Sequence, residues 1–341
     1  MNLKQLAEHL KLSPTTVSRA LNGFPEVNED TRSRVLAAAR RHGYRPNPAA
    51  RRLATGKAGT IGCVMPTKHM VRNDPVFMEF LSGVGEFAAA SGFDIVLSPT
   101  SPDAEDATYR RLAVNGQVDG VFVSFPVSMD SRIELLASLT IPFVVHGRGD
   151  GLSSDYASVD IDNEGAFKRA CVFLIQLGHR RIGFLNGQPQ ATFAEHRQRG
   201  VAGALEDAGL TLDPALSVRA SMTEENGYRE TLRFLDIPER PTALLCSSLF
   251  LALGAIRAIG DRGLTVGRDI SVIAHDDVVP YLRPENFRTP LTTTRSSVRA
   301  AGKRVAERLA EQISGGAPAA GGEVWPVELI VRDSTAPAPG R

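Results

Sequence analysis

Residues 12–23 read Leu-Ser-Pro-Thr-Thr-Val-Ser-Arg-Ala-Leu-Asn-Gly. Ser13 followed by Pro14 is typical of a helix start, because a serine hydroxyl caps free backbone N–H groups and proline is well tolerated at the first helical position. We therefore expect a helix from Pro14 to about Asn22. Apolar residues at helical spacing predict another helix over residues 3–10. Two helices joined by so short a turn are a helix-turn-helix arrangement.

A third helix is predicted from about Asn28 to His42. Acidic side chains fill its first turn, which favours the positive end of the helix dipole, and Gly43 follows its last turn. The apolar stripe that would close a three-helix core consists of Val35, Leu36 and Ala39.

Charge is distributed unevenly along the chain. Residues 1–57 hold eleven Lys and Arg against four Asp and Glu, a balance of +7 in a chain whose formal net charge is +1, so the remainder carries −6. A basic head on an acidic body predicts a polyanionic partner for the head. Thr15, Thr16 and Arg19 fall on the outer face of the second helix, where they could read base edges in a major groove. The alternative is the solvated surface of a generic helical bundle.

Two further segments extend the pattern of residues 12–23. Residues 27–35 read Val-Asn-Glu-Asp-Thr-Arg-Ser-Arg-Val, and residues 43–47 read Gly-Tyr-Arg-Pro-Asn. With these segments the chain resembles the LacI/GalR family of bacterial transcription factors over nearly its whole length. The resemblance implies a homodimer that binds palindromic double-stranded operator DNA, with head contacts from Ser13, Pro14, Thr15, Thr16, Ser18, Arg19 and Asn22.

Residues 47–56, Asn-Pro-Ala-Ala-Arg-Arg-Leu-Ala-Thr-Gly, combine a helix start, good helix formers and a glycine stop. So short a helix is marginal alone in water and should order when a partner supports it. The resemblance implies a hinge helix that contacts DNA through Asn47, Ala50 and Leu53, with Leu53 inserted between base steps of the minor groove. The alternative for Leu53 is a linker residue that packs on the body.

After Gly59, short β-branched runs alternate with helical stretches, which predicts parallel, doubly wound sheets. About 280 residues are too many for one small sheet, so we expect two α/β lobes of the periplasmic-binding-protein type. The expected divisions are a head over residues 1–46, a hinge over 47–58, and an effector-binding and dimerisation body over 59–341. The N-lobe would comprise residues 59–158 and 288–321, and the C-lobe residues 159–287 and 322–336.

Polar residues follow several predicted strands, where ligands of open α/β sheets bind. An arginine and an aspartate converging there can bind the paired hydroxyls of a sugar. The alternative for each residue is structural: Asp276 or Asp277 caps a turn, and His275 belongs to the core. The resemblance implies effector contacts at Arg197, in a loop before Gly200, and at Asp276. The full set of candidates is Phe77, His146, Arg148, Phe193, Arg197, Ser248 and Asp276.

Two departures from the family bear on this pocket. Many relatives carry an acid at the place of Gly147, and Ser248-Leu249 replaces a frequent Asn-Asp. The phrases at residues 141–148, 176–182 and 290–297 look most like the subgroup that governs α-glucoside utilisation. The resemblance thus implies a repressor released by a sugar effector, although a corepressor is the opposite possibility.

Other classes of protein find little support. Phosphate-loop, nucleophile-elbow, zinc-protease and dinucleotide motifs are absent, so we expect neither an enzyme nor a cofactor or metal site. Three scattered cysteines and no long apolar run favour a reducing cytoplasm and no membrane span. The Gly/Pro/Ala-rich tail lacks leucine heptads, which favours a dimer over a coiled-coil tetramer. The rivals are a periplasmic-type sugar receptor and a sugar-metabolising enzyme with a regulatory head.

Overall fold

The computed structural model of the chain describes residues 1–44, 56–66, 74–150, 156–315 and 321–340. The chain forms two compact units, Met1–Ala58 and Gly59–Arg341, here called the head and the body. The predicted hinge helix, with Asn47, Ala50 and Leu53, lies outside the described residues. Among the helices that are described, none is long and apolar enough to cross a membrane.

The head contains the three predicted helices, α1 (Leu3–Leu10), α2 (Pro14–Leu21) and α3 (Glu29–Arg41). Ser13 caps α2 as expected, with its hydroxyl accepting the Thr16 N–H at 3.0 Å. The core includes Leu6, Ala7, Val17, Ala20, Val35, Ala38 and Ala39. Leu36 was expected in this core, but it is only partly buried and does not belong to the cluster, whereas Ala38 does.

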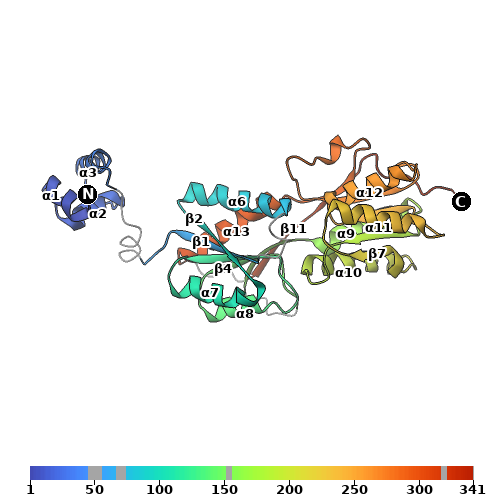
Figure 1. Cartoon of the computed structure of the whole chain (residues 1–341), viewed down its shortest axis with the longest axis horizontal. Helices are drawn as coiled ribbons and strands as arrows, with labels where there is room; N and C mark the ends of the chain where they lie inside the picture. The colour runs from blue at the N-terminus through green and yellow to red at the C-terminus, as the bar shows by residue number, and fades with distance from the viewer. Residues whose placement is uncertain (45–55, 67–73, 151–155, 316–320, 341) are drawn as a thin grey trace. The chain divides into compact units, whose positions relative to one another are not determined.

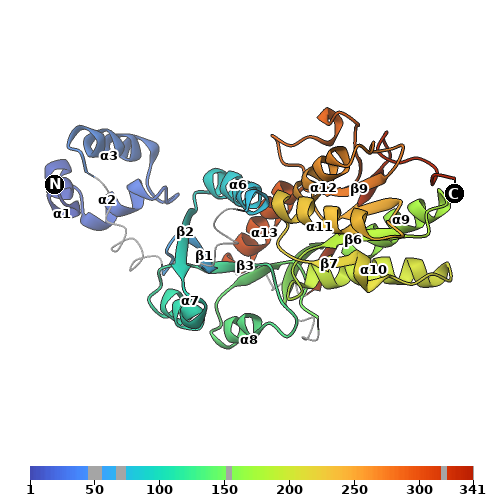
Figure 2. The same cartoon turned by 45° about the vertical axis from the view of Figure 1, so that its right-hand side comes forward.

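The N-lobe of the body is built on a six-stranded parallel sheet in the order β11-β5-β4-β3-β1-β2. Helices α6 and α13 cover one face and α7 and α8 the other (Figures 1 and 2). The strands are β1 (Thr60–Pro66), β2 (Asp94–Thr100), β3 (Gly120–Ser124), β4 (Phe143–His146), β5 (Ala157–Ile161) and β11 (Gly321–Trp325). The helices are α6 (Pro75–Ser91), η1 (Pro102–Ala104), α7 (Glu105–Val114), α8 (Ser131–Ser138) and α13 (Val298–Ile313).

The C-lobe repeats this plan with the strand order β12-β10-β9-β8-β6-β7. Its pairs are parallel except β10 with β12, which is antiparallel. The strands are β6 (Ile182–Asn186), β7 (Ser217–Arg219), β8 (Ala243–Cys246), β9 (Ser271–Asp276), β10 (Thr292–Arg295) and β12 (Glu328–Ile330). The helices are α9 (Asn163–Gln176), α10 (Thr192–Asp207), η2 (Pro214–Leu216), α11 (Glu224–Asp236), α12 (Leu249–Asp261) and η3 (Pro284–Asn286). The prediction of two doubly wound lobes is confirmed.

The chain passes between the lobes three times, and these passages differ from the expected lobe boundaries. They follow β5 at Ile161, β10 at Arg295 and β11 at Trp325. Residues 159–161 and β11 therefore belong to the N-lobe sheet, whereas β10 belongs to the C-lobe sheet. The expected boundaries were wrong because the three strands that precede the passages, β5, β10 and β11, were not predicted.

Three helix pairs are packed so closely that only glycine fits at the contact. A Cβ on Gly302 of α13 would overlap the Phe80 carbonyl oxygen of α6, and one on Gly200 of α10 would overlap the Glu164 carbonyl oxygen of α9. Gly254 of α12 makes the equivalent approach to α11. Each pair is thus fixed backbone against backbone, inside one lobe.

Candidate functional site

The second helix of the head presents polar side chains on its outer surface. Arg19 is exposed, and its side chain makes no ion pair or hydrogen bond with any other residue in the described part of the chain. Thr15 is also exposed, whereas Thr16 Oγ1 bonds Ser13 Oγ at 2.8 Å and Asn22 Nδ2 donates to the Ser18 carbonyl at 2.8 Å. The structure therefore places the candidate residues on α2 and at its two caps, outside its buried face: Ser13, Pro14, Thr15, Thr16, Ser18, Arg19 and Asn22.

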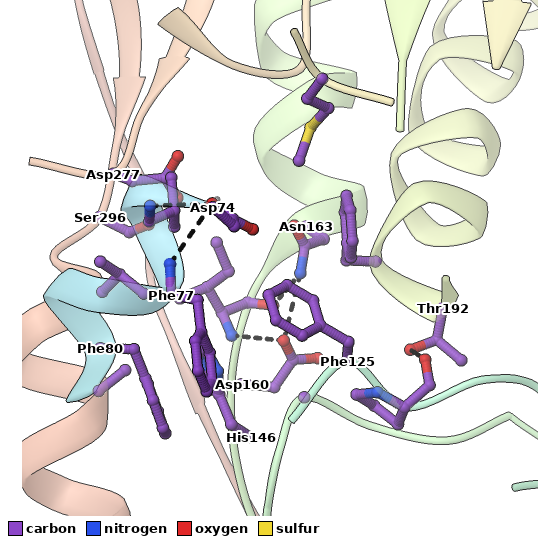
Figure 3. Close-up of a pocket in the computed structure, with 18 of the residues that line it drawn as sticks. Asp74, Phe77, Phe80, Phe125, His146, Asp160, Asn163, Thr192, Asp277 and Ser296 are labelled. Atoms are coloured by element: carbon purple, nitrogen blue, oxygen red, sulfur yellow. Dashed lines mark hydrogen bonds between the residues drawn. The ribbon is translucent and has the colours of Figure 1, made fainter. Parts of the chain in front are cut away.

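Within the body, residues from both lobes enclose a cleft of about 820 Å³, measured out to its open mouth. The passages after Ile161 and after Arg295 contribute residues to it, and Figure 3 shows aromatic rings and carboxylates around the space. The described lining comprises Asp74, Val76, Phe77, Phe80, Phe125, Pro126, His146, Gly147, Asp160, Ile161, Asn163, Thr192, Phe193, Arg197, Met222, Asp277, Ser296, Ser297, Val298 and Ala301.

Arg197 is the cation of this cleft, and it is held rigidly. Its side chain is 5% exposed and lies between the rings of Phe167 and Phe193, each centred 4.9 Å from the guanidinium carbon. Nε donates to Asn163 Oδ1 at 2.8 Å and Nη1 to the Ser247 carbonyl at 2.7 Å. The two N–H groups of Nη2 have no hydrogen-bond partner among the described residues, so they remain for a ligand.

Burial lowers the pKa of Arg197 to about 10, with Asp277 and Asp160 opposing that shift, so the guanidinium stays charged at neutral pH. Leaving a donor of a buried charge unpaired is costly. A ligand oxygen at Nη2 would remove that cost.

Aromatic rings form an apolar part of the cleft lining. His146 stacks on Phe80 with ring centres 4.4 Å apart and 17° between planes, and Phe77 lies 6.0 Å from Phe125. Burial lowers the pKa of His146 to about 4, so its ring is neutral at physiological pH. Ring faces of this kind pack against the C–H faces of a sugar, which are apolar.

Three carboxylates complete the lining. Asp160 is satisfied by the protein, because it accepts from Arg148 Nε at 2.8 Å, the Ile161 N–H at 2.8 Å and Asn163 Nδ2 at 3.2 Å. Asp74 caps α6 and Asp277 follows β9 from the other lobe, where its Oδ1 lies 3.4 Å from His275 Nε2. Burial raises the pKa of Asp74, and the charge of Asp277 adds to that rise.

The structure brings together four of the seven predicted effector residues, Phe77, His146, Phe193 and Arg197. Arg197 and Phe193 lie in the first turns of α10 rather than in a loop, because the segment from Thr192 is rich in good helix formers.

The other three predicted residues do not line the cleft. Arg148 is turned to Asp160, and Ser248 caps α12 by accepting the Leu251 N–H at 3.2 Å. Asp276 is 3% exposed and accepts the Val278 N–H at 2.8 Å, which is the turn-capping alternative. Because side chains alternate along a strand, the next residue, Asp277, faces the cleft instead.

Sequence reasoning missed Asp74, Asp160, Asn163 and Phe125. Asp74 stands before Pro75, which is a helix-start signal, so its position could have been found. Asp160 lies in β5 and Asn163 begins α9 just after it, and because β5 was not predicted, nothing marked them as residues of a strand end.

A second set of contacts joins the lobes at Asp150, which precedes the second lobe in the chain and follows β4. Arg199 of α10 donates to Asp150 Oδ2 at 3.0 Å and also reaches Glu164 Oε2 at 3.1 Å. Close by, Thr192 donates through both its backbone N–H and its hydroxyl to the Pro126 carbonyl, each at 3.1 Å. The bonds to Asp150 and to the Pro126 carbonyl cross from one lobe to the other, so they depend on the angle between the lobes.

A helix-turn-helix head joined to a two-lobed body with a ligand-sized cleft defines a DNA-binding regulator controlled by a small molecule. Comparison with known proteins agrees. Residues 2–47 match "Bacterial regulatory proteins, lacI family" and residues 172–335 match "Periplasmic binding protein-like domain". The chain belongs to the lacI family of bacterial regulatory proteins.

Its relatives are transcription regulators rather than enzymes. The chain is 57% identical over 341 residues to the HTH-type transcriptional regulator AglR of Rhizobium meliloti (strain 1021), covering 100% of this chain and 96% of that protein. The Lac repressor dimer bound to operator and the anti-inducer ONPF superposes with a TM-score of 0.85 at 27% identity, over 98% of this chain and 99% of that one. A complex of the transcriptional regulator CelR with cellobiose superposes with a TM-score of 0.72 at 27% identity, over 97% of this chain and 99% of that one.

Proposed function

We propose that this regulator is a homodimeric repressor that binds a palindromic operator and is released by an α-glucoside bound in the cleft. The observation that carries the sugar assignment is Arg197, a buried guanidinium between two phenyl rings whose Nη2 donors are left for a ligand in a cleft that also holds Asp277. An arginine donor and an aspartate acceptor together match neighbouring hydroxyls. The α-glucoside class rests on the resemblance of residues 141–148, 176–182 and 290–297 to that subgroup.

DNA binding is assigned to the exposed face of α2. Arg19 and Thr15 would read base edges, Ser13, Pro14, Thr16, Ser18 and Asn22 would position the helix, and the hinge residues Asn47, Ala50 and Leu53 would contact the minor groove. The Lac repressor structure is of a dimer on operator, which supports a dimer here. A protein that acts on the bacterial chromosome acts in the cytoplasm.

The mechanism is a linkage between the cleft and the head. A sugar that contacts Arg197 in the C-lobe and Phe77 in the N-lobe favours one angle between the lobes, and a change in that angle moves the start of β1, from which the chain leads to the head. Effector and operator must then weaken each other's binding by the same factor.

The test is operator binding by the full chain with a panel of trehalose, maltose, sucrose, glucose and galactose at one fixed salt concentration. We expect an α-glucoside to release the operator. Arg197→Lys keeps the charge but loses the forked donors, so it should weaken the sugar response at least about tenfold and leave operator affinity unchanged. Tighter operator binding with sugar would identify a corepressor, and no response to any of the five sugars would contradict the assignment.

A further inference from the structure

We infer that the cleft selects an uncharged glycoside and rejects the same sugar when it carries a phosphoryl group. The inference rests on the sugar effector proposed above and concerns the chemical class of that sugar. It follows from the arrangement of charges around the cleft, which the family assignment does not specify.

The described lining holds three carboxylates, Asp74, Asp160 and Asp277, against one guanidinium, Arg197, which gives a formal charge of −2. Arg148, outside the lining, neutralises Asp160 through its 2.8 Å bond. Two carboxylates then face one guanidinium, and the neutral His146 adds no positive charge. No lysine is present among the lining residues that the structure describes.

The single guanidinium does not carry enough charge for a phosphoryl group. Nε and Nη1 of Arg197 each donate one hydrogen bond, to Asn163 and to the Ser247 carbonyl, and these bonds hold the side chain in place. The two N–H groups of Nη2 and the second N–H of Nη1 remain as donors, and they suit hydroxyl or ring oxygens. One guanidinium supplies a single positive charge, whereas a phosphoryl group carries about −1.5 to −2 charges at neutral pH.

The two other carboxylates of the cleft also favour an uncharged sugar. Asp74 from the N-lobe and Asp277 from the C-lobe lie together, beside Ser296, as Figure 3 shows. Each has an oxygen that no described residue bonds, because Asp74 is bonded by backbone N–H groups through Oδ1 and Asp277 contacts His275 through Oδ1. Carboxylate oxygens only accept hydrogen bonds. They therefore favour sugar hydroxyls, which donate, and repel a phosphoryl group, which does not.

The probe pair is trehalose and trehalose 6-phosphate, two α-linked glucose disaccharides that differ only in the phosphoryl group. Binding to the full chain would be measured by calorimetry at about 0.15 M salt and by the fluorescence of Trp325. This residue is the chain's single tryptophan and the last residue of β11, at the third passage between the lobes. We expect trehalose to bind at least about tenfold more tightly than its phosphate, equivalent to about 1.4 kcal/mol.

A charge-removing variant tests the cause. Asp277→Asn keeps the shape of the side chain but removes one negative charge. The ratio of the two dissociation constants, trehalose 6-phosphate over trehalose, should therefore fall at least about threefold. Asp207→Asn, at the exposed end of α10 with its side chain 64% exposed, is the matched control and should leave the preference unchanged.

The outcomes separate the two proposals. Equal or tighter binding of trehalose 6-phosphate would overturn this inference while leaving sugar recognition intact. An unchanged preference in Asp277→Asn, in a variant that binds trehalose, would remove Asp277 as its cause and overturn the charge argument. Failure of both probes, and also of maltose and sucrose, would overturn the proposed sugar effector and this inference with it.

Discussion

Asp150, reached from the N-lobe strand β4, and His196 of the C-lobe helix α10 meet between the lobes, with His196 Nε2 3.0 Å from Asp150 Oδ1. His196 is buried, and Arg199 bonds the other oxygen of the same carboxylate. Burial alone would raise the pKa of Asp150, but the hydrogen bonds from His196 and Arg199 outweigh it and hold the pKa below its usual value. One carboxylate thus stabilises one particular angle between the lobes.

Replacing this carboxylate should change that angle. Asp150→Ala removes both interlobe bonds, so the population of more open bodies should rise, with a radius of gyration that increases in small-angle scattering. Asp103→Ala, on an exposed side chain in η1, is the control and should have no effect. An unchanged scattering curve in Asp150→Ala would show that Asp150 does not fix the angle.

Replacing Asp276 and Asp277 one at a time tests which of the two carboxylates binds the sugar. Asp277→Ala should weaken sugar binding by about 1.5–3 kcal/mol, the usual contribution of a hydrogen bond to a charged group. Asp276→Ala should instead lower the free energy of unfolding. Asp276 Oδ1 accepts a hydrogen bond from the Val278 N–H, and its Oδ2 lies 3.6 Å from Arg295 Nε. Calorimetry and thermal unfolding of both variants separate these effects, and the reverse pattern would restore Asp276 to the pocket.

Arginines of the head divide into one that reads DNA and one that supports the fold. Arg19→Ala should cost about 1–3 kcal/mol of operator affinity and much less on random DNA. Arg32 bonds the carbonyls of Phe24 and Val27 at 2.8 and 3.3 Å, so Arg32→Ala should lower the thermal stability of the head. Fluorescence anisotropy with both DNAs measures the first effect, and retained discrimination in Arg19→Ala would contradict the groove assignment.

Acid should destabilise the body through its buried histidines. Burial lowers the pKa of His146 to about 4 and also lowers the pKa values of His179 and His275. The unfolded chain therefore binds protons that the folded chain does not, and stability falls as the pH drops from about 6.5 towards 4. For His146 the loss reaches about 3 kcal/mol, at 1.36 kcal/mol per pH unit.

Thermal unfolding between pH 7.5 and 4.5 measures this loss. His146→Gln should make stability depend less steeply on pH. The comparison variant is His42→Gln, which replaces a partly exposed histidine of the head and should leave the pH dependence of the body unchanged. An identical pH dependence in wild type and His146→Gln would contradict the neutral state of the ring.

Two glycines of α10 give opposite predictions. Gly200→Ala should destabilise the body by about 1–3 kcal/mol, because the added methyl group meets the Glu164 carbonyl of α9. The methyl group added by Gly203→Ala has no neighbour within 4 Å among the described residues, so this substitution should stabilise the helix by up to about 1 kcal/mol. Urea unfolding of the two variants makes the comparison, and equal stabilities would show that α9 can move away.

The sequence predicts most of the fold because its strongest signals are local. Ser13-Pro14 marks a helix start, and apolar runs mark the central strands β1, β3, β4, β6, β8 and β9. The strands β5, β7, β10 and β11 were missed because they are short or rich in polar residues such as Thr292–Thr294 and Ser158. Their places depend on pairing with strands far along the chain, which no local pattern reports.

The cleft was predicted in part for the same reason. Arg197 and Phe77 were named correctly as lining residues because they belong to recognisable segments, whereas the choice between Asp276 and Asp277 depends on where β9 ends. A shift of one residue along a strand moves a side chain to the other face. Asp160 could not be assigned without β5.

The glycine contacts at Gly302, Gly200 and Gly254 fix how movement can spread through the body. Helices locked backbone to backbone cannot slide past one another by small steps, so each lobe turns as a solid piece and the bending is confined to the passages near Ile161, Arg295 and Trp325. A signal from the cleft would then reach the start of β1 as a tilt of the whole N-lobe. No relay of side chains from residue to residue is required, and substitutions inside a lobe should alter its stability more than its response to the effector.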